Sequence, residues 1–179
     1  MQPLFTAERI RGRVTELATL IHRDHPDGVH LVGVLKGSFV FLADLMRALP
    51  GPATIDFVAV TSYGNQTTSS HRVQMLKDLD HSVSGRDVVL VEDIVDTGVT
   101  LSYLLNLLGS RKPRALRTAC LLSKPSRLEV PVRLDYVGFR IADDFVVGYG
   151  LDHAEAHRSL PYIAVIDLPH RLKSRDTPG

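Results

Sequence analysis

The chain has 179 residues, of which 44% are hydrophobic and 23% are charged, and this suits one soluble globular domain with a sizeable core. Its formal net charge of +1 gives no electrostatic reason to expect a nucleic-acid partner. No apolar run approaches membrane-spanning length and the first residues do not resemble a signal peptide, so we expect a cytoplasmic protein with no membrane partner. The single cysteine, Cys120, cannot form an internal disulfide, and its apolar neighbours favour a buried thiol over a nucleophile.

The first predicted element is an amphipathic helix over residues 6–23, whose apolar side chains recur on one stripe at helical spacing. Thr6 is its expected N-cap, because a hydroxyl there can accept a hydrogen bond from a free amide of the first turn. The turn at residues 25–28 contains proline and glycine and ends the helix. We find no chemistry in this segment and expect it to cover a sheet face or a partner subunit.

The second predicted unit runs from a strand through a tight turn into a helix. An apolar run over residues 30–35 predicts a buried strand, and residues 39–49 predict an apolar helix. Lys36-Gly37-Ser38 lies between them and is either a solvated loop or a seat for an anion. The spacing alone leaves both interpretations open.

The third predicted unit is a strand followed by a polar stretch. Residues 54–61 alternate at a period of roughly two, which predicts a strand. Residues 62–70 are polar with few apolar anchors, a composition typical of a flexible hairpin tip. Residues 77–80 are expected to return as a strand, and residues 85–87 to turn into the next one.

The most informative stretch covers residues 88–101. An apolar run over residues 88–91 predicts a strand that is buried on both faces, as in a parallel sheet. Glu92 and Asp93 follow, and two adjacent carboxylates at a buried strand end are costly unless cations or hydroxyl groups meet them. A polar turn over residues 96–100 then leads into a helix whose leucines recur at helical spacing.

This polar turn has the features of a phosphate seat. The first amides of a helix have no partner within the helix and carry the positive end of its dipole. Gly98 lets a ligand approach the backbone, and Thr97 and Thr100 add hydroxyl donors. The preceding acids can instead hold sugar hydroxyls or Mg²⁺. The alternative is an ordinary strand–turn–helix in which Asp96 or Thr97 only caps the helix, but three acids and two threonines exceed what a cap requires.

The C-terminal part of the chain predicts shorter elements. Residues 116–122 predict a strand, and Lys124 lies just beyond its end. Residues 135–141 and 145–149 predict two short strands, and residues 163–166 predict a last one.

Two histidines, His153 and His157, are four residues apart, so on a helix they would share one face. This is a possible transition-metal spacing. No third ligand is present beyond nearby carboxylates, so a zinc site has little support and the role of the two histidines stays open.

Several of these segments together resemble one family. Val-Glu-Asp-Ile-Val-Asp-Thr-Gly-Val-Thr at residues 91–100 resembles the phosphoribosyl-pyrophosphate (PRPP) motif of type I phosphoribosyltransferases. Its Glu-Asp pair, and its Asp before Thr-Gly, resemble the 6-oxopurine branch, the hypoxanthine-guanine phosphoribosyltransferases. Leu-Lys-Gly-Ser at residues 35–38, Ser-Tyr-Gly at 62–64 and Asp-Phe-Val-Val-Gly-Tyr-Gly-Leu-Asp at 144–152 resemble the same family, so the resemblance extends over nearly the whole chain.

The resemblance implies an α/β fold, the type I phosphoribosyltransferase fold, in which a mostly parallel twisted sheet is flanked by helices and carries a small hood subdomain. Residues 1–179 would form a single domain. The hood would come from about residues 125–179 with the N-terminal segment, and residues 62–77 would form a mobile loop. Such a lid is physically reasonable, because a reactive ribosyl cation in open water would be hydrolysed. The resemblance also implies a cis peptide bond between Leu35 and Lys36.

The resemblance further implies a role for each matching residue. Asp96 would be the catalytic residue, acting as general base or acid at N7 of the purine. Glu92 and Asp93 would bind the ribose hydroxyls directly or through Mg²⁺, and Asp152 would approach a second Mg²⁺, so these three are the implied metal ligands. The remaining implied substrate-binding residues are Lys36 and Gly37 at pyrophosphate, Ser62 and Tyr63 on the mobile loop, Thr97, Gly98, Val99 and Thr100 at the 5′-phosphate, Lys124, Phe145 and Val146 at the purine, and Arg158 at pyrophosphate.

The implied reaction belongs to purine salvage. The 5-phosphoribosyl group of PRPP would be transferred to N9 of hypoxanthine or guanine, which gives IMP or GMP and pyrophosphate, with Mg²⁺ as cofactor. A homodimer or homotetramer is also implied. One alternative is a non-catalytic PRPP sensor, which the near-neutral charge and the lack of an output segment disfavour. A second is a pyrimidine or orotate transferase, which Lys124 and the Phe145-Val146 pair disfavour.

Overall fold

The computed structural model describes residues 1–63 and 72–166 of the chain. Its helices are α1 (Ala7–Asp24), α2 (Phe39–Ala48) and α3 (Val99–Ser110), and a short 3-10 helix, η1, covers Pro125–Arg127. Its strands are β1 (Pro3–Phe5), β2 (Val29–Leu35), β3 (Ala53–Tyr63), β4 (Arg72–Lys77), β5 (Asp87–Val95), β6 (Ala115–Ser123), β7 (Tyr136–Arg140), β8 (Val146–Val147) and β9 (Ile163–Val165).

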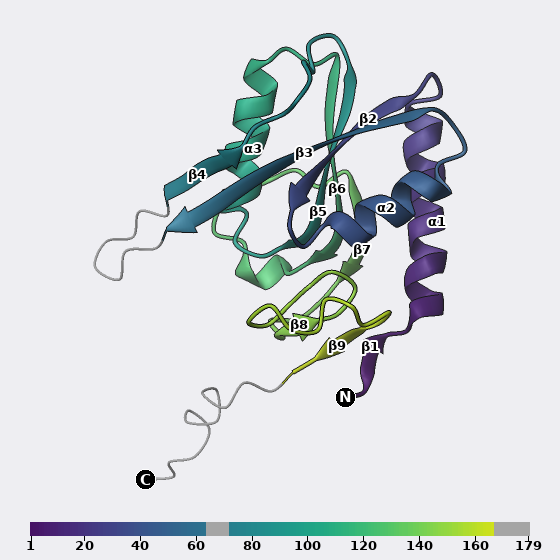
Figure 1. Ribbon diagram of the computed structural model, residues 1–179, viewed down its shortest axis with the longest axis vertical. Coiled ribbons are helices and arrows are strands. Elements are labelled where there is room, and N and C mark those ends of the chain that lie inside the picture. The colour runs from purple at the N-terminus through teal and green to yellow at the C-terminus, as the bar shows by residue number, and fades with distance from the viewer. Residues whose placement is uncertain (64–71, 167–179) are drawn as a thin grey trace.

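The strands form two sheets. The larger has the order β4-β3-β2-β5-β6-β7, in which only β4 pairs antiparallel with its neighbour, and the smaller has the antiparallel order β1-β9-β8. Figure 1 shows α1 and α2 on one side of the large sheet, α3 on the other, and the small sheet beyond one end of it. This confirms the predicted α/β class. None of the helices in the described ranges is both long enough and apolar enough to cross a bilayer.

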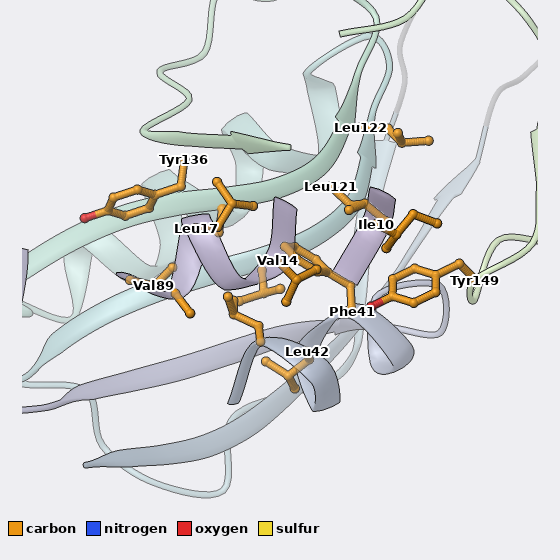
Figure 2. Close-up of a cluster of buried hydrophobic side chains, with 14 of the residues drawn as sticks. Ile10, Val14, Leu17, Phe41, Leu42, Val89, Leu121, Leu122, Tyr136 and Tyr149 are labelled. Carbon is orange, nitrogen blue, oxygen red and sulfur yellow. The ribbon is translucent and has the colours of Figure 1, made fainter. Parts of the chain in front are cut away.

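One face of the large sheet packs against α1 and α2. The buried side chains there include Ile10, Val14 and Leu17 from α1, Phe41 and Leu42 from α2, and Val89 and Leu121 from the sheet (Figure 2). Burying each such side chain contributes about 1.5–3 kcal/mol of transfer free energy. The predicted amphipathic helix is therefore confirmed, and its apolar stripe covers the sheet. Its predicted N-cap is also confirmed, because Thr6 Oγ1 accepts a hydrogen bond of 3.3 Å from the amide of Arg9.

The other face of the large sheet packs against α3. Leu104 and Leu108 of the helix are fully buried over Val88 and Leu90 of β5, and Cys120 of β6 belongs to the same cluster. Burial raises the pKa of the Cys120 thiol to about 12. The predicted buried thiol is confirmed, and at neutral pH it carries almost no thiolate.

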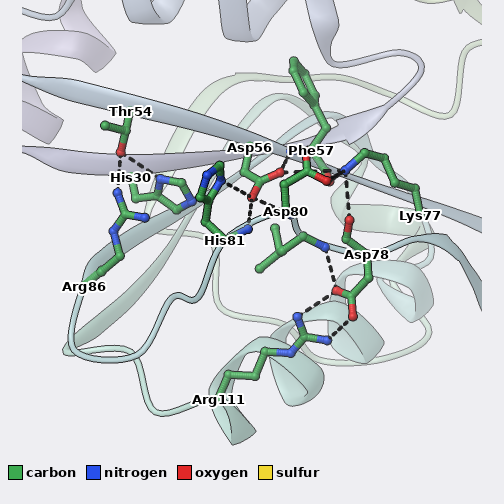
Figure 3. Close-up of polar contacts among 11 residues, drawn as sticks. His30, Thr54, Asp56, Phe57, Lys77, Asp78, Asp80, His81, Arg86 and Arg111 are labelled. Atoms are coloured by element: carbon green, nitrogen blue, oxygen red, sulfur yellow. Dashed lines mark hydrogen bonds and ion pairs between the residues drawn. The ribbon is translucent and has the colours of Figure 1, made fainter.

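A polar network fixes the segment that follows β4 (Figure 3). Asp56 on β3 is buried and accepts hydrogen bonds from the amides of Asp80 at 2.9 Å and His81 at 3.0 Å. Arg111, at the C-terminal end of α3, donates to both carboxylate oxygens of Asp78 at 2.7 Å. Burial acts to raise the pKa of Asp56, but the backbone donors outweigh it and the net pKa is lowered. These bonds hold the segment between β3 and α3.

Some predicted boundaries differ from the structure. The returning strand was expected at residues 77–80, but β4 covers Arg72–Lys77 instead. It begins earlier because β3 extends to Tyr63, which pairs with Arg72. Residues 62–63 and 72–77 of the predicted loop are thus strand, and residues 64–71 lie outside the described residues. Mobility of this loop stays a prediction.

The C-terminal part of the chain is divided between the two sheets. β1 pairs with β9, and β9 pairs with β8, so the N-terminal segment joins the small sheet. β7 falls inside the range 125–179 that was expected to form the hood, yet it pairs in parallel with β6 and belongs to the large sheet.

Candidate active site

The predicted site residues lie where parallel strands end. The turns that follow β2, β5 and β6 carry Lys36, residues 96–100 and Lys124, respectively. The carboxyl ends of parallel strands share one edge of a sheet, and ligands of open α/β sheets bind outside that edge. The fold therefore brings together three segments that are distant in sequence.

The turn before α3 forms a pocket of about 100 Å³. Gly98 is the N-cap of α3 and has φ +83°, and a Cβ at this position would lie 2.6 Å from the carbonyl oxygen of Val130. The carbonyl oxygen of Thr97 accepts hydrogen bonds from the amides of Glu129 and Val130, which fixes the turn from behind. The pocket is lined by Glu92, Ile94, Val95, Asp96, Thr97, Gly98, Thr100 and Leu101. A pocket at a helix N-terminus favours a small anion.

Neither Asp96 nor Thr97 occupies the N-cap position of α3. The N-cap is Gly98, and no side chain caps α3 there. Thr97 Oγ1 receives a long contact of 3.4 Å from the amide of Val99, which leaves its hydroxyl able to donate.

The two adjacent acids lie within β5, which continues to Val95 because its last residues pair with β6. Successive strand residues point to opposite faces of a sheet. Glu92 lines the pocket before α3 and is 7% exposed, whereas Asp93 approaches Gly37 in the turn after β2. Burial raises the pKa of Glu92 well above its usual value, and the neighbouring charge of Asp93 raises it further.

Asp93 is packed against backbone. A Cβ on Gly37 would lie 1.7 Å from Asp93 Oδ2, and a Cβ on Gly150 would lie 2.3 Å from the carbonyl oxygen of Gly37. The peptide bond between Leu35 and Lys36 is cis, as expected. Burial raises the pKa of Asp93 to about 6, although two backbone amides and Arg158 act to lower it, and the charge of Asp152 adds to the rise. Only glycine fits between this carboxylate and the hood.

A second charged group surrounds Arg158. Its Nη2 is 2.8 Å from Asp152 Oδ1 and 3.4 Å from Glu155 Oε2, and its Nη1 donates to the carbonyl oxygen of Gly150 at 2.8 Å. Its Nε is buried with no partner among the described residues. Lys36 Nζ donates to Glu155 Oε1 at 3.2 Å, so Glu155 contacts both cations that the sequence assigned to pyrophosphate. Glu155 was not among the residues predicted from the sequence.

A third group contains Lys124 and Asp96. Lys124 is buried, and its Nζ is 3.6 Å from Asp143 Oδ1. Arg127 Nε donates to Asp96 Oδ1 at 3.0 Å. Sequence reasoning missed Arg127 and Asp143. The sequence signal that could have indicated them is their position along the chain, because Arg127 follows Lys124 by three positions and Asp143 precedes Phe145 by two.

Two of the residues that the sequence assigned to the purine lie at the start of β8. Val146 is buried on β8, and Phe145 is 36% exposed, with its ring edge-on to His153 at 5.2 Å between centroids. An exposed aromatic ring at the site can stack on a planar ligand. The helix that would place His153 and His157 on one face is absent, because this segment is a turn in which Ala154, Glu155 and His157 have positive φ.

Ser62 and Tyr63 lie at the end of β3, where they pair with Val73 and Arg72 of β4. Their predicted contact with substrate stays a prediction.

The implied Mg²⁺ would need carboxylate ligands that lie close together. Glu92, Asp93 and Asp152 do not form one ligand set, since Glu92 and Asp93 point to opposite faces, and no three His, Cys, Asp or Glu side chains in the described residues group closely enough to hold an ion. The negative charge of Asp152 nevertheless acts on the buried Asp93 and raises its pKa. Mg²⁺ commonly binds one or two carboxylates together with substrate phosphates and water. These two carboxylates fit that mode.

Replacing Asp93 by asparagine is expected to stabilise the ligand-free protein above about pH 6 by up to about 3 kcal/mol, the equivalent of two pKa units. The raised pKa means that the native state keeps a proton that the unfolded chain has lost, so the free energy of unfolding of the unsubstituted protein falls as pH rises from about 4 to about 6. Urea denaturation across this range checks the expectation, with the exposed Asp27→Asn as control. A gain that is equal at every pH would contradict it.

The chain is similar in sequence to proteins of known family. Residues 4–154 match the family described as the phosphoribosyl transferase domain. The chain is 48% identical over 171 residues to the hypoxanthine-guanine phosphoribosyltransferase of Mycobacterium tuberculosis, a match that covers 92% of this chain and 85% of that protein.

Two solved structures show the same similarity in three dimensions. A hypoxanthine-guanine phosphoribosyltransferase from Bacillus anthracis superposes with a TM-score of 0.89 at 45% identity, covering 93% of this chain and 99% of the other. A hypoxanthine phosphoribosyltransferase from Trypanosoma cruzi, solved as a ternary complex with its substrates, superposes with a TM-score of 0.88 at 43% identity, covering 93% of this chain and 95% of the other.

Proposed function

Because this chain belongs to the hypoxanthine-guanine phosphoribosyltransferase family, and is thus a phosphoribosyltransferase of purine salvage, we propose that its residues divide the transfer among three groups. In the proposed reaction, the 5-phosphoribosyl group of PRPP moves to N9 of hypoxanthine or guanine and pyrophosphate leaves. The observation that carries this assignment is the small pocket at the N-terminus of α3, whose lining includes both Glu92 and Asp96.

The first group binds the phosphoribosyl end. The amides of the turn at residues 97–100, with the hydroxyls of Thr97 and Thr100, would bind the 5′-phosphate. Val99 would contribute through its backbone. Glu92 and Asp93 would accept hydrogen bonds from the ribose hydroxyls, which meets the need of these buried carboxyl groups for a donor. A bound phosphoribosyl group thereby satisfies polar groups that are costly when left alone.

The second group binds pyrophosphate. Lys36 and Arg158 approach the same carboxylate, Glu155, so their cationic groups are close enough to share one anion. The unpartnered Nε of Arg158 and the backbone around Gly37 offer further donors. The Asp93–Asp152 pair fits Mg²⁺, which when bound would neutralise part of the charge on the departing pyrophosphate. Ser62 and Tyr63 would contribute from the end of β3.

The third group binds the purine and handles its proton. Lys124 has only N–H donors, which suit the 6-oxygen of hypoxanthine and guanine and oppose the amino group of adenine. Phe145 would stack on the ring, and the backbone of Val146 would meet its edge. Asp96 would face N7 and accept or return the proton as N9 bonds to the ribose.

One assay tests the proposed function. The protein is incubated with PRPP and Mg²⁺ together with hypoxanthine, guanine, xanthine, adenine, uracil or orotate, and pyrophosphate release is followed. Release with hypoxanthine and guanine but not with adenine is the expected result. Two results would reject the proposed substrates: pyrophosphate release with orotate or uracil but not with hypoxanthine or guanine, and pyrophosphate release without any base.

Replacing Lys124 by alanine is expected to lower the preference for hypoxanthine over adenine by about ten- to a hundredfold, because the donor that rejects an amino group is lost. The measurement is the ratio of kcat/KM values for the two bases. Lys112→Ala, on the exposed turn before β6, is the matched control and should leave the ratio unchanged. An unaltered ratio in Lys124→Ala would show that another group contacts position 6.

We also propose that the protein is a cytoplasmic homodimer or homotetramer. Support comes from α2, where Phe39 and Met46 are exposed and Phe39 lines a pocket of about 800 Å³ between α1, α2 and residues 158–161. Exposed apolar side chains that border a cavity are typical of subunit contacts. Light scattering of the protein in solution measures its mass and tests the proposal.

A further inference from the structure

Four charged side chains of alternating sign run from the purine-binding lysine to the proton-handling aspartate. Lys124 Nζ is 3.6 Å and Arg127 Nε is 3.7 Å from the same oxygen, Asp143 Oδ1. Arg127 Nε also donates to Asp96 Oδ1 at 3.0 Å. The two inner members, Arg127 and Asp143, have no role in the function assigned above.

We propose that Arg127 and Asp143 are positioning residues, which hold Asp96 and Lys124 at a fixed separation on one purine ring. This inference rests on the proposed function, since it assigns the purine to Asp96 and Lys124. Those two groups come from the ends of different strands, β5 and β6, and a planar base has fixed distances between its N7 and its 6-oxygen. Both groups must therefore be held relative to each other as well as to the backbone.

Arg127 is suited to orient Asp96. Its Nε bond engages one carboxylate oxygen, which leaves Oδ2 for the purine and restricts rotation of the carboxylate. The backbone of Arg127 is itself anchored, because its amide donates to the carbonyl oxygen of Lys124 at 3.0 Å, and the amide of Lys124 donates to that of Val95 at 2.9 Å. These two backbone hydrogen bonds link Arg127 through Lys124 to Val95, the residue before Asp96, so the backbone that carries the guanidinium is held close to Asp96.

Asp143 is suited to orient Lys124. The side chain of Lys124 is 8% exposed, and a buried ammonium requires a negative partner. Asp143 provides it at a distance that is longer than a hydrogen bond, so the ammonium keeps donors free for a ligand. Because Asp143 also attracts Arg127 through the same oxygen, a change at Asp143 reaches Asp96 through Arg127.

A loss of folding stability would not explain a change in the kinetics of an Arg127 variant. The side chains of Arg127 and Asp96 are 42% and 43% exposed, and exposed ion pairs of this kind contribute little to folding. Variants at Arg127 should consequently keep the thermal midpoint of the unsubstituted protein while their kinetics change.

The test is steady-state kinetics with hypoxanthine, guanine and adenine at saturating PRPP and Mg²⁺. Arg127→Gln is expected to lower kcat by about ten- to a hundredfold with little change in the KM of the base, and Arg127→Lys, which keeps the charge, should recover part of that loss. Asp143→Asn is expected to raise the KM of hypoxanthine by about tenfold and to reduce the preference over adenine. Arg133→Gln is the control, because Arg133 Nε also contacts a carboxylate, Asp135 Oδ1 at 2.8 Å, but neither residue belongs to the proposed site.

The outcomes separate the inference from the function on which it rests. Absence of pyrophosphate release by the unsubstituted protein would reject the proposed function. An active protein in which Asp96→Asn is slow but Arg127→Gln keeps kcat within about twofold, or in which Arg127→Gln and Arg133→Gln behave alike, would overturn the inference. A change in kcat for Arg127→Gln, together with a change in base KM and selectivity for Asp143→Asn, would support it.

Discussion

Replacing Asp96 by asparagine is expected to slow turnover by about 10²- to 10⁴-fold, the contribution that a positioned general acid or base commonly makes. Asparagine keeps the shape of the side chain, and its carbonyl oxygen can still accept the hydrogen bond from Arg127 Nε. It cannot take a proton from the purine, however. PRPP binding should survive, because the backbone of the turn and not the carboxylate of Asp96 is proposed to bind the phosphate.

Two measurements separate these effects. Calorimetry gives the dissociation constant of PRPP, and pyrophosphate release at saturating substrates gives kcat. Asp27→Asn is the control, since Asp27 is an exposed aspartate in the turn before β2, away from the edge that carries the site. Unchanged kcat in Asp96→Asn would remove Asp96 from the proton step, whereas a large loss of PRPP affinity would mean that its carboxylate shapes the phosphate turn.

Replacing Gly98 by alanine is expected to raise the KM of PRPP by at least about tenfold, because the turn that would bind the phosphate cannot keep its shape. The residue has φ +83°, a region that costs a residue with a Cβ roughly 1–2 kcal/mol. The added Cβ would also lie 2.6 Å from the carbonyl oxygen of Val130, which is backbone and cannot rotate away. The turn must therefore move, and its amides move with it.

Two other glycines serve as matched controls for the Gly98 variant. Gly85 has φ +70° with open space around it, so Gly85→Ala reproduces the strain without the collision. Gly109 lies in the same helix, with its nearest neighbour 4.0 Å from an added Cβ, so Gly109→Ala should stabilise the helix by about 0.5–1 kcal/mol. Kinetics with varied PRPP and thermal unfolding of all three variants check the expectation. It fails if Gly98→Ala keeps the KM of the unsubstituted protein.

The fold was readable from the sequence because its central elements carry strong local patterns. The apolar run at residues 88–91 and the leucines of α3 are compatible with a buried parallel strand and a packed helix, and the structure has both. The extension of β3 to Tyr63 was not readable, because it depends on pairing with β4 rather than on apolar alternation. The histidine pair illustrates the same limit, since helical spacing was assumed where the backbone forms a turn.

Many of the residues that line the candidate site could also be predicted from the sequence. Which charged side chains contact each other within the site could not. A polar turn between an apolar strand and a helix is a local signal, and Asp96, Gly98 and Thr100 all line the pocket before α3. The only sequence signal for Arg127 and Asp143 was their closeness along the chain to Lys124 and Phe145. Arg127 ends the short helix η1 and Asp143 lies in the bend before β8, and the partner of each lies on another segment.

By itself, the sequence determined the class of fold, the strand–turn–helix that offers an anion seat, and the identity of the residues around it, because each of these depends on neighbours along the chain. The tertiary structure decided which charges meet: Glu92 and Asp93 diverge to opposite faces, Glu155 contacts both Lys36 and Arg158, and Arg127 contacts Asp96. Electrostatic and hydrogen-bond contacts act over a few ångströms in space, and those distances exist only after the strands have been placed side by side.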